Sequence, residues 1–207
     1  MKVMNKVKFA LYTSMHPLDG FYEIRHRNKG SEFLALLFVF IFSISFSINK
    51  QYASFIVNEN NTQYVNSFFD LIGIFLFYLL FCVANWSVTC LMEGEGRFKD
   101  IITITGYATL PLIFTLIPAT IISHFIAANE EALYYLILSV SLIWFTIILA
   151  LGIMTIHNFS LGKAILTGLL TFFAMVIIIF VTVLIFSLIQ QIFLFLKSIY
   201  TELVFSI

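Results

Sequence analysis

Residues 164–196, AILTGLLTFFAMVIIIFVTVLIFSLIQQIFLFL, hold no charged side chain between Lys163 and Lys197. A bilayer core about 30 Å thick is crossed by about 20 mainly apolar residues in a helix. This stretch therefore predicts a membrane-spanning helix over residues 164–195. Because the stretch is longer than one crossing needs, we expect the helix to tilt or to continue along the interface.

The same absence of charge recurs in four other parts of the chain, bounded by Glu32 and Lys50, Asp70 and Glu93, Asp100 and Glu130, and Glu131 and Lys163. We predict four further membrane helices, over residues 33–49, 71–92, 102–127 and 133–156. The expected fold is therefore an all-α, polytopic membrane bundle of five helices. The alternative is fewer spans with one re-entrant segment, since the first run is short and prolines interrupt the third.

The composition agrees with a membrane protein. The 207 residues are 61% hydrophobic, 17% aromatic and only 11% charged, whereas soluble domains are about 25% charged. These values argue against a soluble enzyme, a disordered tail and a secreted disulfide scaffold. Eleven acidic and eleven basic residues balance, so charge gives no reason to expect a nucleic-acid partner.

The distribution of lysine and arginine predicts the orientation. With the N-terminus in the cytoplasm, nine basic residues lie inside and only Lys50 and Lys197 lie outside. The positive-inside rule favours this arrangement. We therefore expect a multi-pass protein of the cell membrane with a cytoplasmic segment over residues 1–32, a membrane domain over 33–207 and the C-terminus outside. No cleavable signal peptide is recognisable at the N-terminus.

Residues that support catalysis are scarce. Within the expected spans His124 is the one ionisable side chain, although transporters and intramembrane enzymes use such groups there. The four histidines show no metal-ligand spacing, and no phosphate-binding loop or nucleophile elbow occurs. We therefore expect no catalytic residue, no metal and no cofactor, and a protein that is not an enzyme.

The N-terminal segment holds the first candidate binding residues. Pro and Gly predict a turn in the stretch that contains His16, Pro17, Asp19, Gly20 and Phe21. Before it, apolar residues at helical spacing alternate with lysines, which predicts a short amphipathic helix in the membrane interface. Two interpretations remain open, namely a docking element for a partner and an anchor that sets orientation.

A second group of candidates surrounds the loop after residue 92. Asn85 and Trp86 lie near the end of the expected helix, and the loop contains Glu93, Gly94, Glu95, Gly96 and Asp100. The glycines allow tight or left-handed turns. Partner binding is one interpretation of these residues. Helix packing by Asn85 and a plain charged turn are the other interpretations.

The third expected helix carries features that break helices, in a stretch that contains Gly106, Tyr107, Pro111 and Pro118. Proline removes a backbone donor and bends a helix, and membrane helices tolerate such breaks where neighbours satisfy the backbone. A broken helix marks either a binding site near the bilayer midplane or structural shaping.

Several of these motifs together resemble the bacterial branch of the Yip-domain membrane proteins. The resemblance rests on His16-Pro17-x-Asp19-Gly20-Phe21, on Asn85-Trp86 followed by Glu93-Gly94-Glu95-Gly96 and Asp100, on Tyr107-Ala108-x-x-Pro111, and on Ser160-Leu161-Gly162-Lys163 after His157. It implies five membrane helices with a cytoplasmic N-terminus. Eukaryotic relatives bind Rab-type GTPases, but their Asp-Leu-Tyr-Gly-Pro motif is missing from this chain.

The resemblance also implies a function, because many bacterial relatives look like companions of carbohydrate ABC importers. We therefore expect a non-catalytic accessory or scaffold subunit that contacts membrane lipid and binds other integral membrane proteins, including ABC importer permease subunits. Two alternatives stay open. One is a small permease or channel whose path follows the proline-broken third helix, and the other is a membrane-organising protein.

Overall fold

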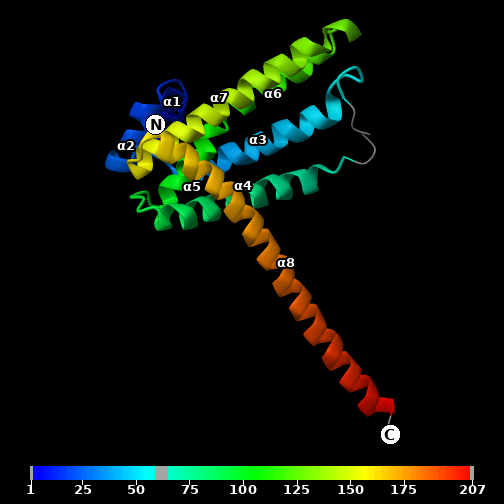
Figure 1. Cartoon of the computed structure of the whole chain (residues 1–207). Helices are drawn as coiled ribbons and strands as arrows, with labels where there is room; N and C mark the ends of the chain where they lie inside the picture. Colours follow the sequence, from blue (N-terminus) through cyan, green and yellow to red (C-terminus); the bar gives the residue numbers. More distant parts are fainter. Residues whose placement is uncertain (1, 59–64, 206–207) are drawn as a thin grey trace.

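The computed structural model describes residues 2–58 and 65–205, and all the regular elements in these two ranges are helices. Figure 1 shows their arrangement. In chain order they are α1 (Lys2–Met15), α2 (Pro17–Arg27), α3 (Glu32–Tyr52), α4 (Ser67–Leu91), α5 (Phe98–Ala108), α6 (Leu110–Ser123), the short 3₁₀ turn η2 (Ala128–Glu130), α7 (Glu131–His157) and α8 (Leu161–Phe205).

The described residues contain five segments long and apolar enough to cross a membrane, which confirms the predicted all-α class and the number of spans. They are α3, α4, α5 with α6, α7 and α8. Most begin or end a few residues beyond the uncharged runs, because helix ends at the membrane surface can carry charged side chains. The largest difference is at α8, which continues to Phe205 instead of ending near residue 195.

The third span is broken at Thr109. Helix α5 ends at Ala108, and α6 begins at Leu110 with Pro111 in its first turn. Pro111 has no N–H to donate to the carbonyl four residues before it, so the hydrogen-bond ladder stops here. The Thr109 hydroxyl instead donates to the carbonyl of Gly106 at 2.7 Å. The expected break at Pro118 is wrong, because Pro118 lies inside α6 and does not end it.

The predicted turn over residues 16–22 is wrong, because α2 begins at Pro17 and continues through this stretch. Proline suits the first position of a helix, where its missing N–H has no partner to lose. The short helix predicted before this stretch is present as α1. Ala10, Thr13 and Phe21 of the α1–α2 pair are fully buried, so both helices form part of the bundle.

The α5–α6 span lies at the centre of the bundle. It is the most buried of the five spans. In its most apolar stretch of 18 residues 61% are buried inside the bundle, against 6% in the corresponding stretch of α8. Close approach makes this possible, because a Cβ added at Gly106 would lie 2.7 Å from the backbone oxygen of Ala35 on α3. A residue larger than glycine at position 106 would push these two helices apart.

The bundle has two different ends, which we name the basic end and the far end. The basic end carries α1, α2, the α4–α5 loop and the α7–α8 turn; the far end carries the loops after α3 and α6. Figure 1 shows α8 leaving the basic end and diverging from the other spans. Its buried side chains are confined to its first part, ending at Met175, and residues 181–200 are all exposed.

Candidate functional site at the basic end

The basic end is organised around the carboxylate of Asp100, whose side chain is only 4% exposed. Arg97 donates from Nε to Oδ2 at 2.8 Å and from Nη2 to Oδ1 at 3.1 Å. Arg25 of α2 donates to the same Oδ2 at 3.5 Å. Asp100 also accepts from the backbone N–H of Arg97, a favourable position for an anion because helix N-termini carry partial positive charge.

The two arginines connect the N-terminal helices to the α4–α5 loop. Arg25 donates from Nη2 to the carbonyl of Glu95. Arg97 donates to the carbonyl of Arg25 at 3.2 Å and to Oδ1 of Asn28 at 3.0 Å. Asn28 ends α2 with a left-handed φ of 49°. The hydrogen bond to Asp100 raises the pKa of Arg97 above its ordinary value, so the connection keeps its positive charge.

His157, the last residue of α7, closes the other side of this group. Its side chain is almost fully buried at 1% exposure. Its Nδ1 accepts a hydrogen bond from the backbone N–H of Gly96 at 3.1 Å, so the neutral ring carries its proton on Nε2. The His157 ring stacks on the Phe159 ring, with centroids 5.3 Å apart. Nζ of Lys163 lies over the Phe159 ring, 4.1 Å from its centroid.

The glycines of the α4–α5 loop are explained by this histidine. A Cβ at Gly94 would lie 2.5 Å from Nδ1 of His157, and one at Gly96 would lie 2.5 Å from Cε1. The sequence allowed tight or left-handed turns at these glycines, and the left-handed alternative is wrong, because no described glycine has a positive φ. The left-handed residue of the loop is Glu93, with φ of 58°. Both glycines are therefore needed for the space they leave to the ring.

We name the group Arg25, Gly96, Arg97, Asp100 and His157 the clamp. It joins α2, the α4–α5 loop, α5 and α7, which are far apart in sequence. Both arginines pair with the one carboxylate of Asp100, which leaves a net charge of +1, and the geometry is that of a structural lock. No group of three His, Cys, Asp or Glu side chains suited to a metal ion comes together within 2–58 and 65–205.

The structure divides the residues singled out as partner-binding into two sets. Gly20, Phe21, Asn85 and Asp100 are buried, and Pro17, Gly94 and Gly96 are half-buried, so these serve internal packing. The exposed set is His16, Asp19, Trp86, Glu93 and Glu95. Of the residues singled out, this exposed set is the most accessible at the surface of the basic end.

Asn85 illustrates the buried set. Its Nδ2 donates to the hydroxyl of Thr171 at 3.1 Å, and it is fully buried between α4 and α8. Thr171 in turn donates to the carbonyl of Thr167. This contact corresponds to the helix-packing interpretation of Asn85, because such hydrogen bonds hold membrane helices together.

Tyr107 also has a connecting role. Its hydroxyl accepts from the backbone N–H of Ser31 at 3.2 Å, and its ring meets Phe38 edge-on at 5.6 Å between centroids. Ser31 directly precedes α3, so Tyr107 ties the start of that helix to α5. Together, Gly106 and Tyr107 fix how α3 and α5 meet.

Sequence reasoning missed three members of the clamp, namely Arg25, Arg97 and His157. Arg25 contributed only to the charge count, Arg97 was otherwise only one residue of the charged turn, and His157 matched no ligand spacing. The sequence offered one signal. His157 stands at the end of an apolar run, and Gly94 and Gly96 stand in a charged loop that is expected on the same side of the membrane. Nothing in either segment alone identifies the other as its partner.

Comparison with known proteins gives one match. The family model of the Yip1 domain matches residues 12–184, which is most of the chain and includes every member of the clamp. No curated protein and no solved structure matches the chain.

Proposed function

The chain belongs to the Yip1 domain family, and from this premise we propose that it is a non-catalytic accessory subunit that binds other integral membrane proteins. The partner that we propose is the permease part of a carbohydrate ABC importer. The basic end then faces the cytoplasm, as the positive-inside rule favours for its lysines and arginines.

The observation that carries this proposal is the exposure of α8. The helix packs on α4 and α7 through one face of its first part, where Ala164, Thr167, Thr171 and Met175 are buried. Beyond Met175 it continues to Phe205, and its side chains over residues 181–200 are exposed on every face. This length of unpacked apolar helix suffices to lie along a helix of another membrane protein.

The exposed set at the basic end supplies a second contact. His16, Asp19, Glu93 and Glu95 are polar and accessible, and the clamp holds the segments that carry them in one arrangement. A preformed surface binds with less loss of conformational entropy than a mobile one. The clamp thus supports partner binding without itself touching the partner.

The permease alternative has less support. Among the polar residues of α4 and α5, Asn85 donates to Thr171, Thr89 donates to the carbonyl of Trp86 at 3.0 Å, and Tyr107 accepts from Ser31. Each is therefore engaged in a contact within or between helices. Among the described residues no particular contact favours a membrane-organising role.

Site-specific photocrosslinking in living cells tests the proposal. A photoreactive phenylalanine analogue replaces Phe186 on α8 or Glu95 on the basic end, and a matched control replaces Phe68 at the start of α4. We expect Phe186 to crosslink to an ABC permease subunit in stoichiometric yield, while the position of Phe68 does not. Crosslinking to another integral membrane protein would contradict the importer assignment, and crosslinking to lipid alone at both test positions would contradict partner binding.

A further inference from the structure

The last part of α8 has two unlike faces. At about 100° per helical residue, every charged, amide and aliphatic hydroxyl side chain from Ser187 to Glu202 falls within an arc of about 140°. Lys197 and Glu202 lie at the two edges of this arc. Between them lie Ser187, Gln190, Gln191, Ser198 and Thr201, together with the apolar Leu194. We name this side of the helix the polar arc.

The rest of the circumference over residues 187–202 is apolar and carries large side chains, such as Ile192, Leu196 and Ile199, all of which are exposed. The preceding stretch of α8 shows no such division. Over residues 176–186 the one polar side chain is Thr182, whose hydroxyl donates to the carbonyl of Ile178 at 2.7 Å. The two-faced pattern therefore begins at position 187.

The length of α8 explains why the pattern changes at this position. The helix begins at Leu161 at the basic end. Residues 164–186 extend roughly 34 Å at 1.5 Å per residue, which is enough to cross a hydrocarbon core of about 30 Å. Residues 187–205 therefore begin where the helix reaches the surface of the bilayer opposite the basic end.

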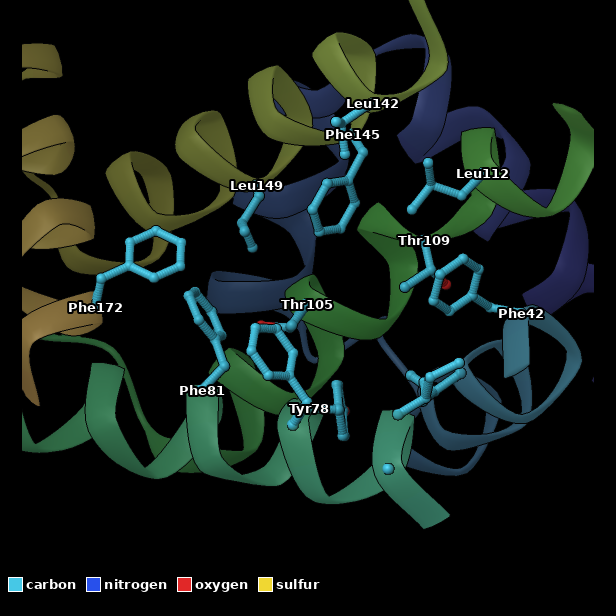
Figure 2. A pocket seen from close by; sticks show the side chains of 14 residues that line it. Phe42, Tyr78, Phe81, Thr105, Thr109, Leu112, Leu142, Phe145, Leu149 and Phe172 are labelled. Atoms are coloured by element: carbon cyan, nitrogen blue, oxygen red, sulfur yellow. The ribbon is translucent and has the colours of Figure 1, made fainter. Parts of the chain in front are cut away.

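The direction of α8 is oblique to the other spans. Figure 2 shows the cavity of about 360 Å³ between α4 and α7, and among the residues that line it Phe172 is the single member from α8, at one end. Figure 1 shows the rest of α8 diverging from the bundle. Residues 169–205 contain neither proline nor glycine, so α8 has no usual site for a sharp bend. A straight helix that crosses obliquely brings one of its sides to the water before the other.

Other placements of residues 187–205 leave one face in unfavourable surroundings. An upright helix that projected beyond the bilayer would expose its whole apolar side to water. A helix that stayed within the core would place in hydrocarbon the amides of Gln190 and Gln191, which make no hydrogen bond with the described part of the chain. A second copy packed on the polar arc would bring two Lys197 side chains together, because a two-fold interface pairs equivalent patches.

We propose that residues 187–205 bind the lipid–water interface at the face of the bilayer opposite the basic end, with the polar arc toward water and the apolar side on the acyl chains. Amphipathic helices bind membrane surfaces in this way. The polar arc holds one lysine and one glutamate, so a neutral, zwitterionic lipid surface suffices, whereas polybasic segments need anionic lipid. This binding does not depend on the proposed protein partner, for which residues 176–186 remain available.

The test maps the surroundings of single spin labels along α8, with the full chain in lipid nanodiscs. Cys90→Ser removes the exposed natural cysteine, the buried Cys82 is kept, and a cysteine then replaces each residue from 187 to 202 in turn. Oxygen concentrates in the hydrocarbon layer and a nickel chelate stays in water, so their collision rates with the label report its surroundings. The Cys90→Ser chain without an added cysteine gives the background.

We expect the two collision rates to vary with the helical period and in opposite phase. The ratio of chelate to oxygen collisions should be about fivefold higher at Ser198 than at Leu196, because roughly 10 Å of helix diameter separates the two faces. Leu194 should resemble Ser198, since its place in the arc decides its surroundings. Phe180 and Leu184 are matched controls, which share the angular range of the polar arc but precede position 187. They should collide with oxygen and not with the chelate.

The lipid composition provides a further check. The same pattern should appear in phosphatidylcholine alone and with added phosphatidylglycerol, because the polar arc is neutral. A pattern that needs phosphatidylglycerol would contradict binding to a neutral interface.

Three results of the label scan would overturn the proposal. Oxygen collisions alone at every position would place the segment in the core, and chelate collisions at every position would place it in water. Low rates of both along one face would show that a second copy or another protein covers it. On the unchanged chain, hydroxyl radicals produced in water should oxidise Leu194 more than Leu196, although both are exposed in the isolated structure. Equal oxidation of this matched pair would contradict the proposal without any substitution.

Discussion

Nδ1 of His157 accepts a hydrogen bond from the backbone N–H of Gly96 at 3.1 Å, across 61 positions of sequence. One residue ends α7 and the other lies in the α4–α5 loop. The contact fixes the loop that presents Glu93 and Glu95 to the surface. It also explains why position 96 is a glycine, which the sequence of the loop by itself does not explain.

Gly96→Ala tests the space under the histidine ring. A Cβ at position 96 would lie 2.5 Å from Cε1 of His157, so we expect a destabilisation of about 1–3 kcal/mol, typical of overpacking. The midpoint of thermal unfolding in detergent measures it. Gly162→Ala is the matched control, since a Cβ there meets nothing within 4 Å. Equal midpoints for the two variants would contradict the contact.

His157→Phe separates the hydrogen bond from the ring. Phenylalanine keeps a ring for stacking on Phe159 but provides no acceptor, so the Gly96 N–H loses its partner at a cost of about 1–3 kcal/mol. Hydrogen exchange at the Gly96 amide should therefore become faster. His124→Phe, at an exposed histidine, should leave it unchanged. Unaltered exchange in the His157 variant would show that the loop is held by other contacts.

Asp100→Asn tests the charged centre of the clamp. Removing the carboxylate charge leaves Arg25 and Arg97 without their counter-ion. The arginine side chains are 21% and 39% exposed. We therefore expect the variant to be destabilised by about 1–3 kcal/mol, which is less than the cost of breaking a fully buried pair. Limited proteolysis should then cut within α1 and α2. The control is Asp19→Asn, at an exposed acidic residue of α2. If the two variants resist the protease equally, the structural role of the clamp is contradicted.

A double-mutant cycle with Asn85→Leu and Thr171→Val tests the attachment of α8. The two side chains share a buried hydrogen bond of 3.1 Å. Pairs of this kind in membranes couple by about 0.6 kcal/mol on average and up to about 1.7 kcal/mol. Unfolding free energies of the four proteins give the coupling. Thr182→Val, at an exposed threonine on α8, replaces Thr171→Val in a control cycle whose coupling should be zero.

Acidification should loosen the turn after α2. A hydrogen bond from Lys29 lowers the pKa of Glu23 below its ordinary value of 4.5. Because the folded-state pKa is the lower one, this stabilisation is complete above pH 4.5 and is lost as the pH falls through the folded-state value. The protection factor of the Lys29 amide, whose N–H donates to the Glu23 carbonyl, should fall in acid. Glu23→Gln should remove this pH dependence, and an unchanged profile would refute the assignment.

The membrane spans were predictable because their cause acts locally. A helix in lipid satisfies its own backbone groups and must be apolar over its length, so uncharged runs reveal it in the sequence alone. The break near Pro111 has an equally local cause, since proline lacks the donor that the helix needs. The N-terminal turn was predicted wrongly, because Pro17 and Gly20 are also compatible with a helix, and burial of Phe21 against the bundle stabilises it.

The candidate site was only half predictable for the opposite reason. Asp100, Gly94 and Gly96 were singled out, but the glycines only as residues that allow tight or left-handed turns, and neither glycine has a positive φ. Their cause is the ring of His157, which reaches them only when α7 packs beside α5. A contact between distant segments depends on how the whole bundle packs, and no local pattern encodes it.

The amino-acid sequence by itself determined that the protein lies in a membrane, how many membrane helices it has, and that the third of them is broken near Pro111. Each of these features depends on residues that are neighbours along the chain. Only the tertiary structure decided that two arginines share the carboxylate of Asp100 and that α8 diverges from the bundle. These outcomes depend on which side chains meet across helices. Packing settles that question through shape and hydrogen bonding over the entire fold.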